Sequence, residues 1–319
     1  MTKERDVVVV VPGGLNTDII GFGVDRLLGK GELSYGGRLV IGPGGKSANI
    51  ARMVAAFLGA GRAAMIGITV EDPLGLWRVP FDALEKAGVV TGHVAVEPYD
   101  PSHPRFPGVA LIPVDRSGNN QIYVLPGINE SLSPAHIQRA DALFSHDSVL
   151  VLTLEMPHET ARAALEKAHG RGMKVVVDPG GIRTPQDIDD LLDERVFLIK
   201  PNEHEAAVIT GVGVHDLGSA RAAAAFFLGR GIRNVMISHG ARGAYLFTDQ
   251  LREHIPAPPV TIDADRDETG CGDQTTAVLA SLIAEGRTVS EAAHPAVRAG
   301  TLQYQRIGIV PVRREEIGA

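Results

Sequence analysis

The sequence predicts an α/β protein in three layers, with a mainly parallel central sheet, helices on both of its faces and a small lid of β-strands. From about residue 60 onward, apolar runs of strand length alternate with segments of helical period. Residues 149–154 and 196–199 are almost continuous apolar runs, which is typical of strands buried on both faces. Because helical segments separate these runs, most neighbouring strands should be parallel.

The expected elements can be placed along the chain from their composition. Residues 7–11 are five valines followed by Pro12, Gly13 and Gly14, and they form the expected first strand. Strand and helix pairs then follow at 63–67 with 74–87, 149–154 with 157–169, 174–177 with 187–193, and 196–199 with 203–210 and 219–228, before a strand at 234–237.

Two regions break this alternation and predict the lid. Residues 19–43 are rich in glycine, and residues 91–125 contain several short β-like runs and a turn at 115–119. We expect antiparallel strands there, at 38–41, 92–96, 109–114 and 121–125. Because so few strands cannot bury a core alone, they should cover a site or join two copies into a homodimer. We treat residues 1–319 as a single domain that carries these lid segments.

Composition restricts the partners of this chain of 319 residues. The net charge of −7 comes from mixed signs without basic blocks, which argues against nucleic acid and anionic membranes. No apolar run approaches the roughly 18 residues that a membrane span needs. One cysteine excludes an internal disulfide and is compatible with a cytoplasmic location. A small molecule is the expected partner.

Residues 267–273 carry the strongest chemical signal. They read Asp-Glu-Thr-Gly-Cys-Gly-Asp and lie between a strand-like stretch at 260–262 and an apolar helical stretch at 274–284. The glycines allow a tight turn, so that the amides of Gly270, Cys271 and Gly272 can point at an anion from a helix N-terminus. A carboxylate beside an anion hole suits a group that takes a proton from the attacking hydroxyl. Asp273 is therefore the candidate base for phosphoryl transfer.

Three further segments end expected strands at the edge where α/β sheets bind ligands. Residues 42–47 read Gly-Pro-Gly-Gly-Lys-Ser, but the first glycine comes two residues too late for a P-loop. Lys46 and Asn49 can still face one point from the following helix. Asn16 and Asp18 are equally typical of an ordinary turn, and Glu155 is equally typical of a helix cap.

The second half of the chain offers a metal motif and a nucleotide motif. Asn202 and Glu205 are three residues apart at a helix start, so they could organise Mg²⁺ or form a capping box, which the spacing alone favours. Residues 238–243 read Ser-His-Gly-Ala-Arg-Gly and could line a nucleotide or form a plain hairpin. Cys271 could be a nucleophile at a helix N-terminus, but a small packing residue is the stronger interpretation.

Taken in order, these motifs resemble the ribokinase-like (PfkB) carbohydrate kinases from Gly13 to about Pro311. Residues 44–49 are similar to the first signature of the family, residues 267–273 to the second, and residues 202–205 to its Asn-x-x-Glu motif. Segments 13–18, 126–134 and 154–157 look most like those of the ribokinases. Cys271 and Glu268 depart from the usual Ala and Thr, and the stretches 22–35 and 98–107 depart from the ribokinase pattern, so the acceptor is left open.

The resemblance implies an ATP-dependent kinase of a free sugar, ribose first, that uses Mg²⁺ and K⁺. It implies that Asp273 is the base and that the amides of Gly270, Cys271 and Gly272 hold the transferred group. The implied sugar-binding residues are Asn16, Asp18, Gly44, Gly45, Lys46, Asn49 and Glu155. Asn202 and Glu205 would organise Mg²⁺ and phosphates. The nucleotide would lie along Asn202, Ser238, His239, Gly240, Arg242 and Gly243. A monovalent cation would lie at Asp267, Thr269, Arg306 and Gly308, mainly on backbone carbonyls.

Four alternatives compete with a free-sugar kinase. Aromatic residues in or near the lid could stack on a nucleoside; they are Phe22, Tyr35, Tyr99, Phe106 and Tyr123. A sugar-phosphate kinase would need cations at the pocket mouth, for which Arg38 and Arg105 are the candidates. An inactive sugar-binding regulator is opposed by the intact motif at 270–273. A cysteine hydrolase would need a histidine beside Cys271 in the fold.

Overall fold

A nine-stranded sheet forms the centre of the protein in this computed structural model, which describes residues 6–117, 119–260 and 267–319. The strand order is β13-β12-β11-β10-β9-β8-β1-β4-β5. Six consecutive pairings, from β11 to β5, are parallel, whereas β12 and β13 add an antiparallel edge. The strands are β1 (Val9–Pro12), β4 (Ala63–Val70), β5 (Val90–Glu97), β8 (Val149–Thr153), β9 (Lys174–Asp178), β10 (Leu198–Ile199), β11 (Asn234–Ser238), β12 (Ala244–Phe247) and β13 (Arg252–Ile255).

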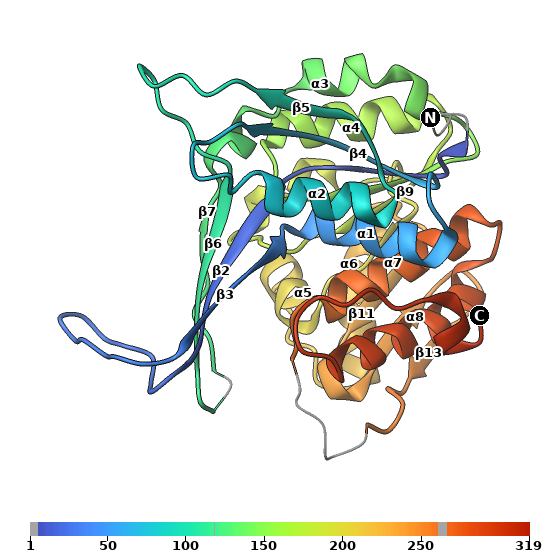
Figure 1. Cartoon of the computed structure of the whole chain (residues 1–319). Helices are drawn as coiled ribbons and strands as arrows, with labels where there is room; N and C mark the ends of the chain where they lie inside the picture. The colour runs from blue at the N-terminus through green and yellow to red at the C-terminus, as the bar shows by residue number, and fades with distance from the viewer. Residues whose placement is uncertain (1–5, 118, 261–266) are drawn as a thin grey trace.

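Helices cover both faces of this sheet, so the predicted three layers are confirmed (Figure 1). One face packs on α1 (Lys46–Leu58), α2 (Arg78–Ala87), α7 (Cys271–Ala284), α8 (Val289–Tyr304) and α9 (Arg314–Ile317). The other packs on α3 (Pro134–Arg139), α4 (His158–Gly170), α5 (Glu203–Thr210) and α6 (Leu217–Gly229). Strand side chains alternate between the two layers, with Val9 and Val11 on the first and Val10 on the second.

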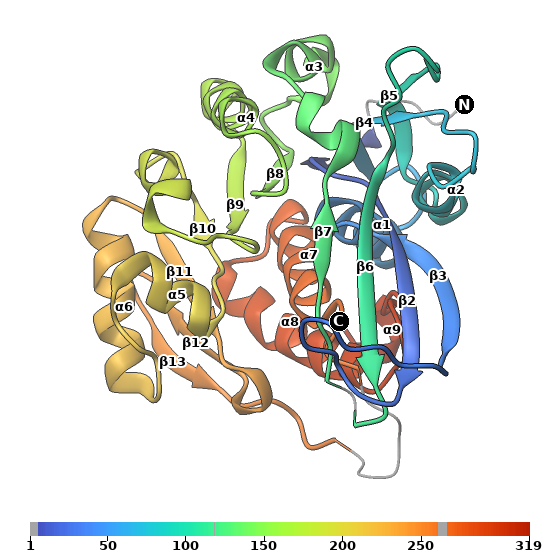
Figure 2. The ribbon, with the colours of Figure 1, turned by 90° about the vertical axis from the view of Figure 1, so that its left-hand side faces the viewer.

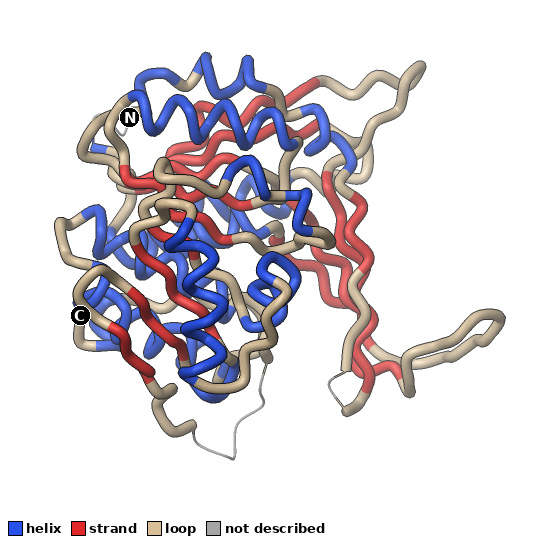
Figure 3. Tube along the Cα trace, turned by 180° about the vertical axis from the view of Figure 1, so that it is seen from behind, coloured by secondary structure: helices blue, strands red, loops and turns tan. Residues whose placement is uncertain are grey.

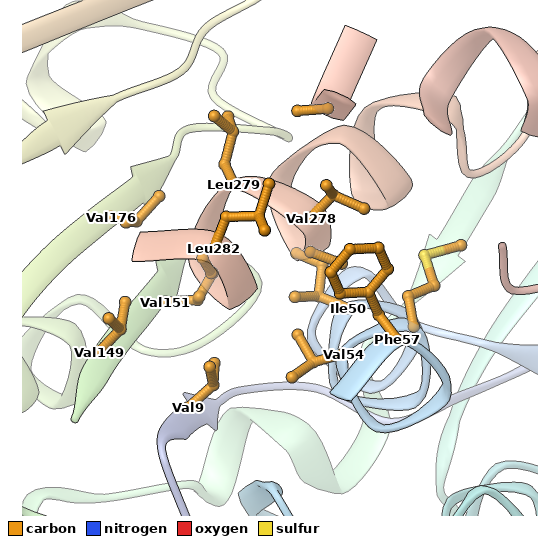
Figure 4. Close-up of a cluster of buried hydrophobic side chains, with 14 of the residues drawn as sticks. Val9, Ile50, Val54, Phe57, Val149, Val151, Val176, Val278, Leu279 and Leu282 are labelled. Carbon is orange, nitrogen blue, oxygen red and sulfur yellow. The ribbon is translucent and has the colours of Figure 1, made fainter. Parts of the chain in front are cut away.

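The packing of α1 against α7 matters most for the site. Figure 4 shows Ile50 and Val54 of α1 facing Val278 and Leu282 of α7 over the central strands. These four side chains are almost completely buried, and burying each one contributes about 1.5–3 kcal/mol. The core therefore fixes the two helix N-termini that carry the first and second signature motifs.

A separate four-stranded sheet forms the lid, in the order β3-β2-β6-β7. Its strands are β2 (Asn16–Val24), β3 (Arg38–Gly44), β6 (Gly108–Asp115) and β7 (Tyr123–Leu125). β2 pairs antiparallel with β3 and parallel with β6, while β6 and β7 form an antiparallel pair. Figure 2 shows this sheet face-on, in front of α7 and α8, and Figure 3 shows it standing out to one side of the body with the 25–37 loop projecting beyond it. The term lid sheet is used below for these four strands.

Several expected elements need correction. The strand expected at 92–96 is wrong as a lid strand, because β5 pairs in parallel with β4 at the edge of the main sheet. The lid is also not wholly antiparallel. The expected helix at 187–193 is replaced by two short 3₁₀ turns, η4 (Pro185–Asp187) and η5 (Asp189–Leu191). Aspartates favour caps and turns over helix interiors, which accounts for this difference.

Other boundaries shift by a few residues. The first strand starts at Val9, α2 begins at Arg78 instead of residue 74, and β2 extends the turn expected at Asn16–Asp18 into a nine-residue strand. Most of the strand expected at 260–262 lies outside the described residues. That residues 1–319 form one domain stays a prediction. Within the described ranges, no helix is both long enough and apolar enough to span a membrane.

Candidate active site

The site gathers at the carboxyl ends of the central parallel strands. Glu155 follows β8, Asp178 ends β9 and Asn202 follows β10. Opposite them, α1 and α7 begin at Lys46 and Cys271. In parallel α/β sheets this edge is where ligands bind.

The start of α7 has the geometry that the second motif predicts. Gly270 caps the helix in the left-handed conformation, with φ of 78°, which favours glycine at this position. The first amides of a helix have no partner within the helix, and its dipole makes this end partly positive. The Cys271 amide donates to the carbonyl oxygen of Glu268 at 3.3 Å, so the protein already uses this member of the predicted anion hole.

Two residues of α1 hold the carboxylate of Asp273. Lys46 Nζ donates to Asp273 Oδ1 at 2.8 Å, and Asn49 Nδ2 donates to Oδ2 at 3.2 Å. Asp273 itself is buried. Both donors lie on one face of α1, as their spacing predicts, and the candidate base is therefore fixed in direction by two groups from the first motif.

Lys46 also joins a second, deeper ion pair. Its Nζ lies 3.2 Å from Asp178 Oδ1, while Lys200 Nζ lies 3.2 Å from Asp178 Oδ2. Burial alone would lower the pKa of Lys46, but the charges of Asp178 and Asp273 outweigh it and raise that pKa well above its ordinary value. Burial likewise opposes ionisation of Asp178, yet Lys200 and Lys46 bring its pKa well below the usual range. Lys46 and Asp178 are therefore both charged at neutral pH.

Asp178 and Lys200 are site residues that the sequence analysis missed. Thr276 of α7 also donates its hydroxyl to Asp178 Oδ2 at 2.5 Å, so the aspartate ties α7 to the sheet. Asp178 carries the signal that identified Glu155, a carboxylate at the end of an apolar strand. Lys200 stands between β10 and Asn202, and its Nζ lies 3.8 Å from where a Cβ on Gly272 would be.

On the acceptor side, Asp18 faces a group of buried charges. Burial, followed by the charge of Glu155, raises the pKa of Asp18 to about 7, although Arg52 partly opposes this shift. Burial lowers the pKa of Arg52 to about 10, and its Nη2 donates to Asn49 Oδ1 at 2.8 Å. Glu155 Oε2 accepts the Lys46 amide at 2.8 Å, and burial raises the pKa of Glu155.

Glycines at the end of β3 leave room for the side chain of Asp18 on the neighbouring strand β2. A Cβ on Gly44 would lie 1.9 Å from Asp18 Oδ1, and Gly45 has φ of 87°, which disfavours any other residue. Asn16 is held by Asn129, whose Nδ2 donates to Asn16 Oδ1 at 2.9 Å. The sequence motifs did not identify Asn129 or Arg52 as site residues. Asn129 contacts Asn16, which is distant in the chain. Arg52 contacts Asn49 on the same face of α1, a position that no motif marked.

The two faces of the lid sheet differ in kind. Strand pairing places Asp18 opposite Gly42 on β3 and Ala110 on β6, so these three residues share the face toward the site. On the other face, one continuous row of apolar side chains crosses all four strands. This outer row consists of Ile41, Ile19, Leu111 and Tyr123, of which Ile41, Leu111 and Tyr123 are exposed.

The Asn-x-x-Glu motif forms the capping box that its spacing favoured. Asn202 Oδ1 accepts the Glu205 amide at 2.8 Å, and Glu205 Oε2 accepts the Asn202 amide at 2.8 Å. Burial and then the charge of Asp178 raise the pKa of Glu205. Two carboxylates that repel one another in a buried site suit a divalent cation. Across the described chain, no three His, Cys, Asp or Glu side chains gather to hold a metal alone.

Residues 238–243, the candidate nucleotide loop, form the hairpin that was the other interpretation of this segment. Residues 238–243 join β11 to the antiparallel β12, and Ser238 pairs with Asn202 across an isolated bridge. The His239 amide donates to the Gly243 carbonyl oxygen at 2.8 Å, and Gly240 and Gly243 both have positive φ. Arg242 Nη1 donates to the His215 carbonyl oxygen at 2.6 Å, so its guanidinium is bound within the protein.

Cys271 has the environment of a packing residue. Burial, followed by the nearby charges of Asp267 and Glu268, raises the pKa of its thiol to about 12. Its Sγ lies 3.7 Å from the Asp267 carbonyl oxygen. A thiol with such a pKa is protonated at neutral pH and is a poor nucleophile.

In the loop that the resemblance implies for a monovalent cation, several polar groups form hydrogen bonds with one another and with Gln303. Asp267 accepts the amides of Thr269 and Gly308 at 2.8 and 2.9 Å. The carbonyl oxygens of Thr269 and Gly308 accept the side-chain amide of Gln303 at 3.3 and 2.7 Å. Arg306 bonds through its guanidinium to the carbonyl oxygens of Val310 and Pro311. The expected carbonyl ligands at Thr269 and Gly308 thus already have a hydrogen-bond donor within the protein.

At the edge of the sheet, the candidate base thus lies beside a helix N-terminus and two buried lysines. Positive groups that can hold a phosphoryl oxygen and a carboxylate that can accept a proton suit phosphoryl transfer to a hydroxyl. The fold and the site define the class of the protein as a small-molecule kinase of α/β type.

The chain belongs to the pfkB family of carbohydrate kinases, whose family model matches residues 8–313. It is 30% identical over 312 residues to a ribokinase from Haemophilus influenzae, and this match covers 97% of each protein. It is 29% identical over 289 residues to a deoxyribokinase from Salmonella typhi, covering 91% of this chain and 90% of that protein. The solved structure of an Arabidopsis thaliana ribokinase complexed with ribose and ATP is similar, with a TM-score of 0.82, 25% identity and coverage of 98% and 97%.

Proposed function

We propose that this protein transfers the γ-phosphoryl group of ATP to a hydroxyl of a free sugar, ribose first. The observation that carries the proposal is the pair of hydrogen bonds that Lys46 and Asn49 donate to the carboxylate of Asp273 at the N-terminus of α7. A base held in a fixed direction next to anion-binding amides meets the main need of phosphoryl transfer, which is positioning. The similar ribokinases support the sugar acceptor.

In this proposal each group of residues in the site has a separate role in the reaction. Asp273 accepts the proton of the attacking hydroxyl, and the Gly272 amide with its neighbours at the start of α7 holds the transferred group. Lys46, whose pKa is raised, and Lys200 lie where they can balance the negative charge of the phosphates. Residues 238–243 with Asn202 line the nucleotide.

Asn202 and Glu205 would organise Mg²⁺ together with the phosphates, partly through water. Mg²⁺ commonly uses one or two carboxylates plus substrate phosphates, which fits this donor set. When bound, the ion supplies charge neutralisation for the phosphates. Potassium is left out of the proposed mechanism, because two of the carbonyl oxygens that would bind it already accept hydrogen bonds from Gln303.

The sugar itself would bind between the lid sheet and the edge of the main sheet. Asn16, Asp18, Asn49 and Glu155 supply convergent hydrogen-bonding groups there, with the backbone of Gly44 and Gly45 close by. The lid face above Asp18 continues with Ile20, Ala110 and Ile112, which suits the apolar side of a small sugar ring.

The alternatives lose support from the side chains that they would need. Phe22 is stacked by Arg38, whose guanidinium lies 4.9 Å from the ring centroid, and Tyr123 belongs to the outer face of the lid. This weakens a nucleoside acceptor. Arg105 is paired with Glu97, so the two arginines do not gather to bind a sugar phosphate. The pKa of Cys271 argues against a cysteine hydrolase.

We also propose that two copies associate through the outer row of the lid sheet. Three of its apolar side chains stand exposed on adjacent or nearby strands, and Leu39 and Leu125 extend the same face. Contiguous apolar surface of this kind marks interaction sites more often than free surface.

An ADP-release screen tests the proposed function. The acceptors are ribose, deoxyribose, fructose, other free sugars, nucleosides and fructose phosphates, each with ATP and Mg²⁺. We expect release above the ATP-only rate with ribose or deoxyribose and little with nucleosides. Equal rates with and without every acceptor would contradict a kinase. A response to nucleosides or sugar phosphates alone would keep the kinase and reject the free sugar.

A further inference from the structure

Gln303 is a buried side chain whose interactions lie wholly in the loop in front of the anion hole. It belongs to the last turn of α8 and has no exposed surface. Its Nε2 donates to the carbonyl oxygen of Thr269 at 3.3 Å and to that of Gly308 at 2.7 Å. One amide group therefore links the residue next to Gly270 with a segment almost forty positions later in the chain.

The surrounding groups fix which end of the Gln303 amide faces the loop. Both neighbours are carbonyl oxygens, which only accept hydrogen bonds, so the NH₂ group must face them. The other end, Oε1, is buried and has no hydrogen-bond partner within the described residues. A buried acceptor without a partner costs free energy. The two hydrogen bonds of the NH₂ group must therefore stabilise the loop enough to offset this cost.

A monovalent cation in this loop would use the same two oxygens. The backbone carbonyls of Thr269 and Gly308 were among its expected ligands, and the amide nitrogen lies within hydrogen-bond distance of both. The carboxylate of Asp267, which lies in the same loop, accepts hydrogen bonds from two backbone amides. Two of the four expected carbonyl ligands are thus satisfied from inside the chain, and this pair does not fit a further cation.

We propose that the side-chain amide of Gln303 takes the place of the monovalent cation, so that the enzyme holds its anion-hole loop in shape without K⁺. The inference rests on the proposed kinase function only where activity is measured. Gln303 is a positioning residue, since it acts on Gly270 and α7 through the loop and does not reach the substrate.

The first test measures turnover of the intact enzyme with its best sugar against K⁺, with choline chloride keeping the ionic strength constant. We expect a flat response. A required cation coupled to catalysis would typically change activity by about 5–150-fold, and a rise of that size in the wild type would overturn the proposal.

The second test removes the amide. Gln303→Ala should lose activity in choline and regain it on addition of K⁺, because the two carbonyl oxygens become free to bind the ion. Gln305→Ala is the matched control on the same helix end, where the glutamine amide only reaches the Thr301 carbonyl oxygen at 3.5 Å. A merely structural glutamine predicts the same loss at every K⁺ concentration, and that result would reject the proposal.

A third test does not depend on activity. A ligand that binds only the folded state raises the melting temperature. K⁺ exchanged for choline should leave Tm of the wild type unchanged and raise Tm of Gln303→Ala. A specific rise in the wild type would overturn the proposal even if no acceptor were found. If the alanine variant does not fold, Gln303→Met keeps the length of the side chain without its donors and should show the same K⁺-dependent Tm.

Discussion

The phosphoryl-transfer centre and the lid sheet are built on opposite principles. In the centre, Asp273, Lys46, Asp178 and Lys200 form a chain of buried charges, each held by at least one partner within 3.2 Å. The lid sheet has few charges on its strands and carries an exposed apolar row on its outer face. The comparison teaches that the chemistry resides where the structure is most constrained, whereas acceptor choice and assembly depend on the lid.

The largest effect is expected from breaking the buried charge chain. Asp178→Ala leaves Lys46 and Lys200 without their shared partner in a buried site, which should lower the free energy of unfolding by about 3–5 kcal/mol. Urea denaturation measures this difference. Asp141→Ala is the control, because Asp141 also pairs with two basic residues, Lys167 and Arg171, but on the surface. Equal losses in the two variants would contradict the comparison.

The next largest effect is expected from a substitution on the outer face of the lid sheet. It should change the association of two copies and not the folding of each copy. Leu111→Lys places a charge in the proposed dimer contact, and an unpaired buried polar group costs roughly 1–3 kcal/mol in each copy. Sedimentation velocity should then show dissociation to monomers. Leu74→Lys, at a leucine that is also exposed but outside the lid, should leave the sedimentation of the wild type unchanged. A monomeric wild type would remove the dimer proposal.

The inner face of the lid is tested by two glycines of β3. Gly44→Ala would place a methyl group 1.9 Å from Asp18 Oδ1 and push that carboxylate away, whereas Gly42→Ala meets no atom within 4 Å. Overpacking typically costs roughly 1–3 kcal/mol, so we expect KM for the sugar to rise by about 10-fold or more in the first variant alone. Similar KM values for both variants would show that Asp18 does not contact the acceptor.

The smallest effect concerns the pH dependence of stability. The pKa of Asp18 is raised to about 7, so the folded protein holds this proton up to a higher pH than the unfolded chain. The contribution of Asp18 is therefore full only below the ordinary carboxyl pKa of 3.8 and is lost progressively as pH rises from there through about 7. Asp18→Asn does not titrate, so between pH 6 and 8 its stability should gain about 1 kcal/mol relative to the wild type. Parallel pH profiles would show that Asp18 has an ordinary pKa.

The sequence predicted those parts of the site that form continuous motifs. Lys46, Asn49 and Asp273 were found because each lies in a short glycine-marked segment at a helix start, and the structure brings the three together. Lys46 and Asp273 are 227 positions apart, so their contact with each other depended on the predicted sheet edge. The main sheet followed in the same way from apolar runs of strand length.

What the sequence missed depends on distant contacts between residues of ordinary local context. Asp178 gives the same strand-end signal as Glu155, but its ion pairs with Lys46 and Lys200 are contacts that only the fold creates. Gln303 lies in the last turn of a helix and gives no local signal at all. β5 was misplaced because its alternating burial is the same for an edge strand of the main sheet and for a lid strand.

The most direct test of the account is the turnover of Asp273→Ala at saturating sugar, ATP and Mg²⁺. A general base contributes about 10²–10⁴ in rate, so turnover should fall by that factor while the affinity for the sugar changes little. Asp249→Ala, at an exposed aspartate in the turn before β13, is the matched control and should keep the wild-type rate. Near-normal turnover of Asp273→Ala would contradict the assignment of Asp273 as the base, and with it the proposed phosphoryl-transfer centre.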